Sequence, residues 1–147
     1  MRKALVLAVL AFGVLLRPAA GAEDKKAGKE EVALHGYCPV AYFAMGKPIE
    51  GDPDLTYKYD GQTYSLANEK AFAMFKKDPA KFAPRYDGYC ATATAMGKEM
   101  ESDPRQFLVY DEALYLFSTE EAKVMFEKDE EGTVEKADKK WAQKSEE

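Results

Sequence analysis

Residues 55–68 read LTYKYDGQTYSLAN. The two flanks of this stretch are rich in Tyr and Thr, which is typical of half-buried strands, and they enclose Asp60-Gly61, a pair that accepts the positive φ angles of a tight hairpin turn. Asn68 follows at the position of a helix N-cap. The stretch therefore predicts a β-hairpin with strands at 55–59 and 62–66, followed at once by a helix.

The residues after Asn68 have helical spacing. Ala71, Met74 and Phe75 lie at i, i+3 and i+4, so they share one helix face, and we expect this face to be buried. Asp78-Pro79 then provides a cap and a first-turn proline for a shorter helical segment, which ends before Pro84.

This pattern occurs a second time, 51 residues later. Residues 44–78 and 95–129 share 16 identities in 35 positions, where composition alone would give roughly two. A unit that is present only twice is too short for a solenoid, so we expect the two copies to pack on each other. The predicted fold class is α+β, with two repeated β-hairpin plus helix units packed into one pseudo-symmetric compact domain.

The second copy predicts strands at 107–110 and 114–117 around Asp111-Glu112. Ser118 is followed three residues later by Glu121, which is a capping-box pattern, so Ser118 is the expected N-cap of the next helix. A last helix is expected after residue 132, folded back over the core. The apolar residues expected on the inner faces of these two helices are Ala122, Met125, Phe126, Val134, Ala137 and Trp141.

The first 22 residues have the features of a secretory signal peptide. Arg2 and Lys3 precede an apolar run at 4–16, and Ala20-Gly21-Ala22 forms a small-residue cleavage site. The run is shorter than the about 20 residues that cross a bilayer. We therefore expect a periplasmic or secreted protein that has no membrane contact after signal cleavage.

The mature chain divides into three predicted parts. These are a flexible charged leader at 23–31, a tandem domain at 32–142 with repeats at about 37–86 and 89–138, and a charged tail at 143–147. Cleavage removes three of the 21 basic residues and none of the 26 acidic ones, so the net charge changes from −5 to 18 − 26 = −8. An acidic chain without clustered Lys and Arg does not suit nucleic acid, which is therefore excluded as a partner.

The first copy resembles the YHS domain family. The resemblance lies in residues 59–69 (YDGQTYSLANE), Phe75, Asp78-Pro79 and 82–84 (FAP). The flanking segments 36–43 (GYCPVAYF) and 88–91 (GYCA) are similar to a subgroup of exported bacterial YHS proteins. The resemblance covers about residues 33–141 and implies a hairpin, a helix and an aspartate-proline step. It also implies metal binding, because several YHS proteins and the related TRASH modules bind heavy metals through cysteines in a treble-clef-like unit.

The positions that match the metal-binding cysteines of that family carry no thiol in this chain. They are occupied by Ala41, Ala67, Ala71, Ser118 and Ala122. None of these side chains supplies a thiolate, so the metal site of the family does not transfer to them.

A different set of ligands is present near the start of each copy. His35 stands three residues before Cys38, and Cys90 occupies the equivalent place in the second copy. Thiolate and imidazole favour copper(I), and the same set also suits zinc. We therefore predict a soft-metal site, copper first, at Cys38 and Cys90 with help from His35. Met45 and Met96 precede expected turns, where their side chains either pack against the protein or act as weak metal ligands.

Two alternatives to the metal site remain open. A disulfide between Cys38 and Cys90 would stabilise the fold by up to ~4 kcal/mol, and unpaired or redox-active thiols are the third possibility. A disulfide-stabilised domain would bind a protein or small ligand through an aromatic cleft between the repeats. The candidate residues of that cleft are Tyr37, Tyr42, Tyr89, Met45 and Met96. Both the disulfide and the metal site require the two sulfur atoms to meet between the repeats.

Catalysis is not expected, and no catalytic residue is assigned. The chain has one histidine, no nucleophile-elbow pattern and no glycine-rich phosphate loop. The predicted function is therefore an exported, non-enzymatic binding module of YHS type, whose partner is a metal ion or an unidentified protein.

Overall fold

A computed structural model describes residues 31–146. The predicted signal peptide and nearly all of the predicted leader lie outside the described residues, as does residue 147. The protein is α+β, as predicted, with two separate two-stranded antiparallel sheets. Within 31–146, no helix is both long enough and apolar enough to cross a membrane.

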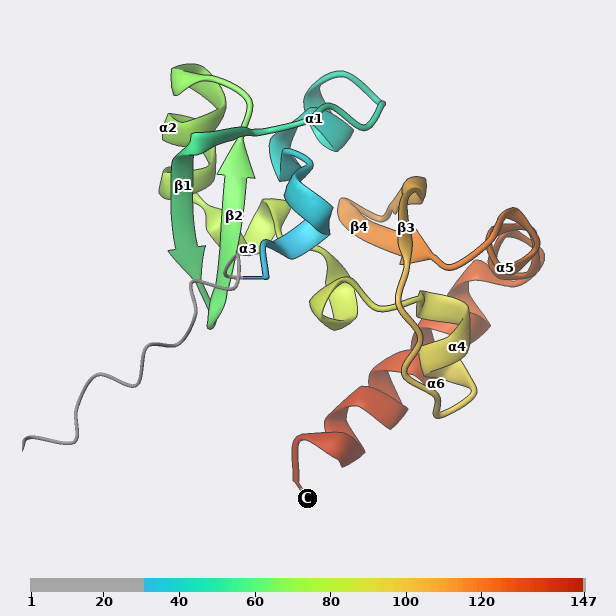
Figure 1. Cartoon of the computed structure of the whole chain (residues 1–147). Helices are drawn as coiled ribbons and strands as arrows, with labels where there is room; N and C mark the ends of the chain where they lie inside the picture. Colours follow the sequence, from blue (N-terminus) through green and yellow to red (C-terminus); the bar gives the residue numbers. More distant parts are fainter. Residues whose placement is uncertain (1–30, 147) are drawn as a thin grey trace, which may run out of the picture.

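The same order of elements occurs in both halves of the chain (Figure 1). The first half consists of η1 (Ala33–Gly36), α1 (Pro39–Ala44), β1 (Asp52–Tyr59), β2 (Gln62–Leu66), α2 (Glu69–Lys77) and α3 (Pro79–Phe82). The second half consists of η2 (Arg85–Gly88), α4 (Ala91–Ala95), β3 (Asp103–Tyr110), β4 (Ala113–Phe117), α5 (Glu120–Glu127) and α6 (Glu130–Lys144). The pseudo-symmetric arrangement of the two halves stays a prediction.

Both predicted hairpins are confirmed. In the first, Tyr59 pairs with Gln62 around Asp60-Gly61, whose φ angles are 49° and 76°. The second hairpin makes the same left-handed turn without glycine, at Asp111-Glu112 with φ angles of 47° and 58°. Each hairpin also has an irregular register near the start of its first strand. These turns match the right-handed twist of the flanking strands.

The cap of α2 is confirmed, but the predicted cap of α5 is wrong by one residue. The Asn68 side chain accepts a hydrogen bond from the N–H of Ala71 at 2.9 Å. In the second half the cap is Thr119, whose side chain accepts from the N–H of Ala122 at 3.1 Å. Ser118 instead donates to Cys90 Sγ at 3.5 Å. Thr119 is the residue with extended backbone before the helix, at φ −144° and ψ 165°, which is the conformation an N-cap needs.

The last helix is longer at both ends than predicted. α6 begins at Glu130, two residues before Gly132, because the Asp129 carboxylate accepts from the N–H of Gly132 at 3.1 Å and caps it. It runs to Lys144, so the helix includes the first part of the predicted tail. Figure 1 shows α6 lying along α4 and running to the C-terminus at the bottom of the view.

The buried residues form two hydrophobic clusters. Cys38, Tyr42 and Phe75 belong to the first, and Cys90 and Phe126 belong to the second. Strand β4 contributes to both. Its Leu114 and Leu116 lie in the first cluster, while Ala113, Tyr115 and Phe117 lie in the second. Alternate residues of a strand point to opposite faces, so β4 joins the two halves of the molecule.

Two methionines that were expected in the core are exposed. The exposed fractions of Met74 and Met125 are 37% and 53%. In α2 the fully buried stripe consists of Ala71 and Phe75, which are one helical turn apart. Met74 lies next to Phe75 in sequence and is therefore rotated about 100° away from that stripe.

Candidate ligand-binding cleft

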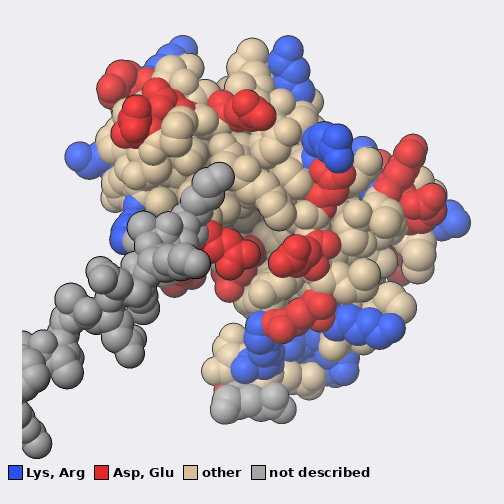
Figure 2. Space-filling view, viewed as in Figure 1, with Lys and Arg blue, Asp and Glu red and all other residues tan. Residues whose placement is uncertain are grey.

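An open cleft of about 750 Å³ lies between the two halves of the molecule. Its buried floor includes Leu34 of η1 and Leu116 of β4. The tip of the first hairpin and the end of α6 contribute Gly61 and Lys144 to its walls. Figure 2 shows acidic side chains on both sides of the hollow between the halves. A volume of this size suits a small organic ligand.

The two 3₁₀ turns place equivalent residues in this cleft. In η1 the φ angles of Leu34, His35 and Gly36 are 59°, 52° and 89°. In η2, Tyr86, Asp87 and Gly88 have φ angles of 57°, 53° and 83°. Both turns are thus left-handed over three residues, and His35 and Asp87 are the central residues. Both line the cleft.

These left-handed turns are held by contacts that occur in each half. The N–H of Tyr37 donates to the carbonyl of Leu34 at 3.0 Å, and the N–H of Tyr89 donates to that of Tyr86 at 2.9 Å. Leu34 and Tyr86 are themselves buried. Left-handed backbone costs roughly 1–2 kcal/mol for each ordinary residue, and the burial of these two anchors offsets that cost. The residue after each anchor is exposed toward the cleft.

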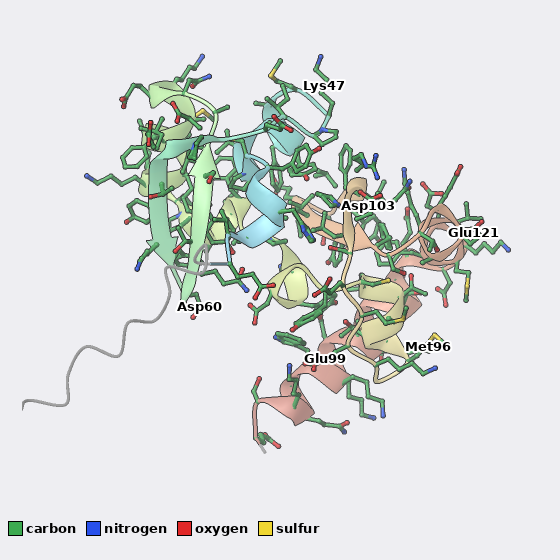
Figure 3. The ribbon with its side chains drawn as sticks, viewed as in Figure 1. Lys47, Asp60, Met96, Glu99, Asp103 and Glu121 are labelled. Atoms are coloured by element: carbon green, nitrogen blue, oxygen red, sulfur yellow. The ribbon has the colours of Figure 1, made fainter. Side chains whose placement is uncertain are left out.

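Asp87 is the carboxylate whose environment is most altered at this site. It keeps contact with solvent, but partial removal of water raises the pKa of its carboxyl group, and the nearby charge of Asp60 raises this pKa further. The ammonium of Lys144 lowers it in part. Asp60 stands at the tip of the first hairpin (Figure 3), and the Gln62 side chain of the same hairpin donates to the carbonyl of Asp87 at 3.4 Å. The first hairpin therefore faces η2 across the cleft.

His35 faces a second charged pair. Arg105 donates to the Asp103 carboxylate at 2.9 and 3.0 Å. These bonds hold the pKa of Asp103 below its usual value, and the charge of His35 adds to this effect. Asp103 begins β3, beside the middle of the molecule (Figure 3). His35 thus lines the cleft and lies within electrostatic range of the start of β3.

Of the five residues predicted to form an aromatic cleft, only Tyr89 lines this one. Tyr42 is buried, and its hydroxyl donates to the carbonyl of Pro104 at 2.7 Å, which joins α1 to β3. Tyr37 packs against the first cluster. Met45 and Met96 are exposed at the ends of α1 and α4, in turns that end at left-handed glycines. Tyr42 and Tyr37 pack in or against the core because each ring buries a large apolar area there.

The disulfide, one of the alternatives that the sequence leaves open, is not supported by this structure. Cys38 and Cys90 are free thiols with exposed fractions of 0% and 1%, and they are not at disulfide distance. Each lies in the hydrophobic cluster of its own half. A bridge would therefore require backbone movement in both halves, because the two α-carbons of a disulfide lie within about 7 Å.

The residues predicted to bind copper or zinc do not fit a metal site in this structure. Within residues 31–146, no three His, Cys, Asp or Glu side chains gather in a way that could hold an ion. The Cys38 thiol is enclosed among apolar side chains, whereas His35 is exposed in the cleft. The two cysteines and the histidine therefore face different environments.

Two residues that line the cleft, Asp87 and Lys144, were not among the predicted site residues. Asp87 had a usable signal, since it follows His35 by the same 52 residues that separate Tyr37-Cys38 from Tyr89-Cys90. Lys144 had none, because the path of α6 depends on packing against α4.

Comparison of the chain with protein-family models, with curated proteins and with solved structures found no match. The resemblance to the YHS family therefore stays a prediction.

Proposed function

We propose that this protein is a non-enzymatic binding module that holds a small polar organic ligand in the cleft between its two halves. The observation that carries the proposal is the pair of left-handed turns, which place His35 and Asp87 in one cleft of about 750 Å³. Backbone strain of this kind persists where a site needs a fixed side-chain direction. The N-terminal 22 residues support an exported location.

The charges around the cleft favour a polar ligand over an apolar one. Glu31, Lys58 and Glu101 line it in addition to Asp87 and Lys144. Only part of the lining is apolar, and the two leucines of the floor are nearly covered by protein. A ligand that offers hydrogen-bond donors and charge would replace water at these groups.

The position of the thiols supports binding rather than catalysis. A cysteine nucleophile needs a base within hydrogen-bond distance and a path for substrate. Cys38 has neither solvent contact nor a place in the cleft lining, and the same holds for Cys90. The cleft lining instead carries carboxylates, lysines and one histidine.

A thermal-shift panel tests this function. The purified protein is mixed in turn with organic ammonium ions, carboxylates, zwitterionic amino acids and neutral polyols, and its melting temperature is measured. We expect at least one class to raise the melting temperature of the wild type and to lose this effect in Asp87→Asn. If no class does so, or if Asp87→Asn responds like the wild type, the proposed function is wrong.

Asp111→Asn is the matched control for this experiment. Asp111 is also a left-handed aspartate, at φ 47°, but it lies at the tip of the second hairpin and does not line the cleft. Asparagine accepts left-handed backbone as readily as aspartate does. The control should therefore keep the ligand response of the wild type.

A further inference from the structure

Lys144 lies where the cleft meets a second cavity. This second cavity, of about 490 Å³, is bounded by Gly97, Lys140 and Trp141, and Lys144 lines both hollows. Lys144 is also the last residue of α6. Its ammonium group therefore lies at a helix end and at the border of both cavities.

The Lys144 ammonium lies against two aromatic rings. Its Nζ is 4.7 Å from the centroid of the Trp141 ring and 5.5 Å from that of Tyr89. The two rings are 6.3 Å apart. A cation within about 6 Å of a ring centroid is attracted by the negative face of the ring. The rings of Tyr89 and Trp141 therefore form a place for a positively charged head.

Carboxylates complete the surroundings of this ammonium. Lys144 forms an ion pair with Glu99, which lies beside the C-terminal part of α6 (Figure 3). The charge of Lys144 also acts on Asp87 across the cleft. We call the group formed by Tyr89, Trp141 and Glu99 the ammonium subsite. It combines two ring faces with one negative charge, as sites for organic cations do.

Lys144 holds this subsite weakly. Half of its side chain is exposed, as is half of that of Glu99, and an exposed ion pair contributes little to stability. A cation–π contact is also weak when it is exposed to solvent. The lysine also loses side-chain entropy by staying in one conformation. A ligand therefore needs to displace only a loosely held, intramolecular ammonium group.

We propose that the ammonium subsite binds the cationic head of a small organic ammonium ligand, and that Lys144 occupies it when the ligand is absent. This inference rests on the proposed binding function of the cleft and names its ligand class. The body of the ligand would lie in the cleft between the halves, where Asp87 and His35 are placed to contact it. Displaced Lys144 would turn into solvent at the end of α6.

The single tryptophan of the chain makes this proposal measurable, because Trp141 reports on its own subsite. Tetramethylammonium chloride is titrated while the fluorescence of Trp141 is recorded. Sodium chloride corrects for ionic strength, and tert-butanol serves as an uncharged probe of similar size. We expect a saturable change with tetramethylammonium and none with tert-butanol.

Lys144→Gln is the decisive variant. Loss of the competing ammonium should tighten tetramethylammonium binding about tenfold, because the ligand no longer has to displace one exposed ion pair and two cation–π contacts. Lys140→Gln is the matched control, since Lys140 lines the second cavity one turn earlier on the same helix. It should leave the affinity unchanged. Neither exposed side chain is part of the core, so both variants should fold.

Two outcomes would overturn the inference: equal affinity in the wild type and Lys144→Gln, or the same fluorescence change with tert-butanol as with tetramethylammonium. Glu99→Gln provides a second measurement, because loss of its charge should weaken binding. If the inference fails while the thermal-shift panel finds a carboxylate or polyol that depends on Asp87, the proposed function stands without its ammonium ligand. If the panel also finds nothing, both are wrong.

Discussion

At the scale of single residues, the notable feature is that two strained turns point different side chains into one cleft. His35 and Asp87 have the same backbone conformation and the same place in their halves, yet one side chain is basic and the other acidic. The two loops have the same backbone conformation but different exposed residues. They therefore provide two unlike contacts for one ligand. The buried anchors, Leu34 and Tyr86, keep the strain in place.

The altered pKa of Asp87 makes the stability of the protein depend on pH. Partial burial and then Asp60 raise this pKa in the folded state, so the ionised carboxylate destabilises the fold at neutral pH. Asp87→Asn should therefore raise the free energy of unfolding at pH 7. The gain stays below about 1 kcal/mol, because the group keeps solvent contact.

The sign of this effect can be checked by urea unfolding at several pH values. The folded state binds the Asp87 proton more tightly than the unfolded chain does, so stability falls as pH rises through the window between the two pKa values. Below both values the carboxyl is neutral in each state, and the gain from Asp87→Asn should vanish. A gain that persists in acid would mean that asparagine acts through backbone conformation, which Asp111→Asn measures separately.

At the scale of elements, the structure separates two neighbouring residues that compete for one cap. Thr119→Ala should destabilise the protein by about 1 kcal/mol, because it leaves the N–H of Ala122 without its side-chain acceptor. Ser118→Ala should cost less, since it loses only a long contact with the Cys90 sulfur. Chemical unfolding of the two variants compares them directly. A larger loss for Ser118→Ala would restore the capping box predicted from the sequence.

Hairpins and helices were largely predictable from the sequence, and the repeat also indicates the helix caps of the second half. Thr119 lies 51 residues after Asn68, and Asp129 lies 51 residues after Asp78. Carrying the first copy onto the second at this offset would have placed the caps of both α5 and α6 correctly. Hairpins and caps depend on residues close in sequence, which is why the pattern sufficed for them.

The site was much less predictable, because it depends on packing between distant segments. Which tyrosines reach the cleft and which enter the core is decided by contacts such as that of Tyr42 with Pro104, 62 residues apart. The two cysteines occupy equivalent positions, but equivalence in sequence does not bring side chains together. Each cysteine is instead buried in the hydrophobic cluster of its own half.

At the scale of the whole molecule, the buried thiols report on how the halves depend on each other. The first cluster includes Leu114 and Leu116, which belong to the second half. Unfolding of the second half would therefore remove these two leucines from the first hydrophobic cluster. We therefore predict that Cys38 and Cys90 become reactive toward iodoacetamide at the same urea midpoint, measured by mass spectrometry of the alkylated peptides.

Leu116→Ala sharpens this test, because it removes a side chain of the second half from the core of the first. It should destabilise the protein by about 2–5 kcal/mol and lower the midpoint of Cys38 together with that of Cys90. If Cys38 stays protected at urea concentrations that fully expose Cys90, the halves unfold independently and β4 does not couple them. If neither thiol reacts in denaturant without a reducing agent, the cysteines are bridged, and the separation of the two clusters would be wrong.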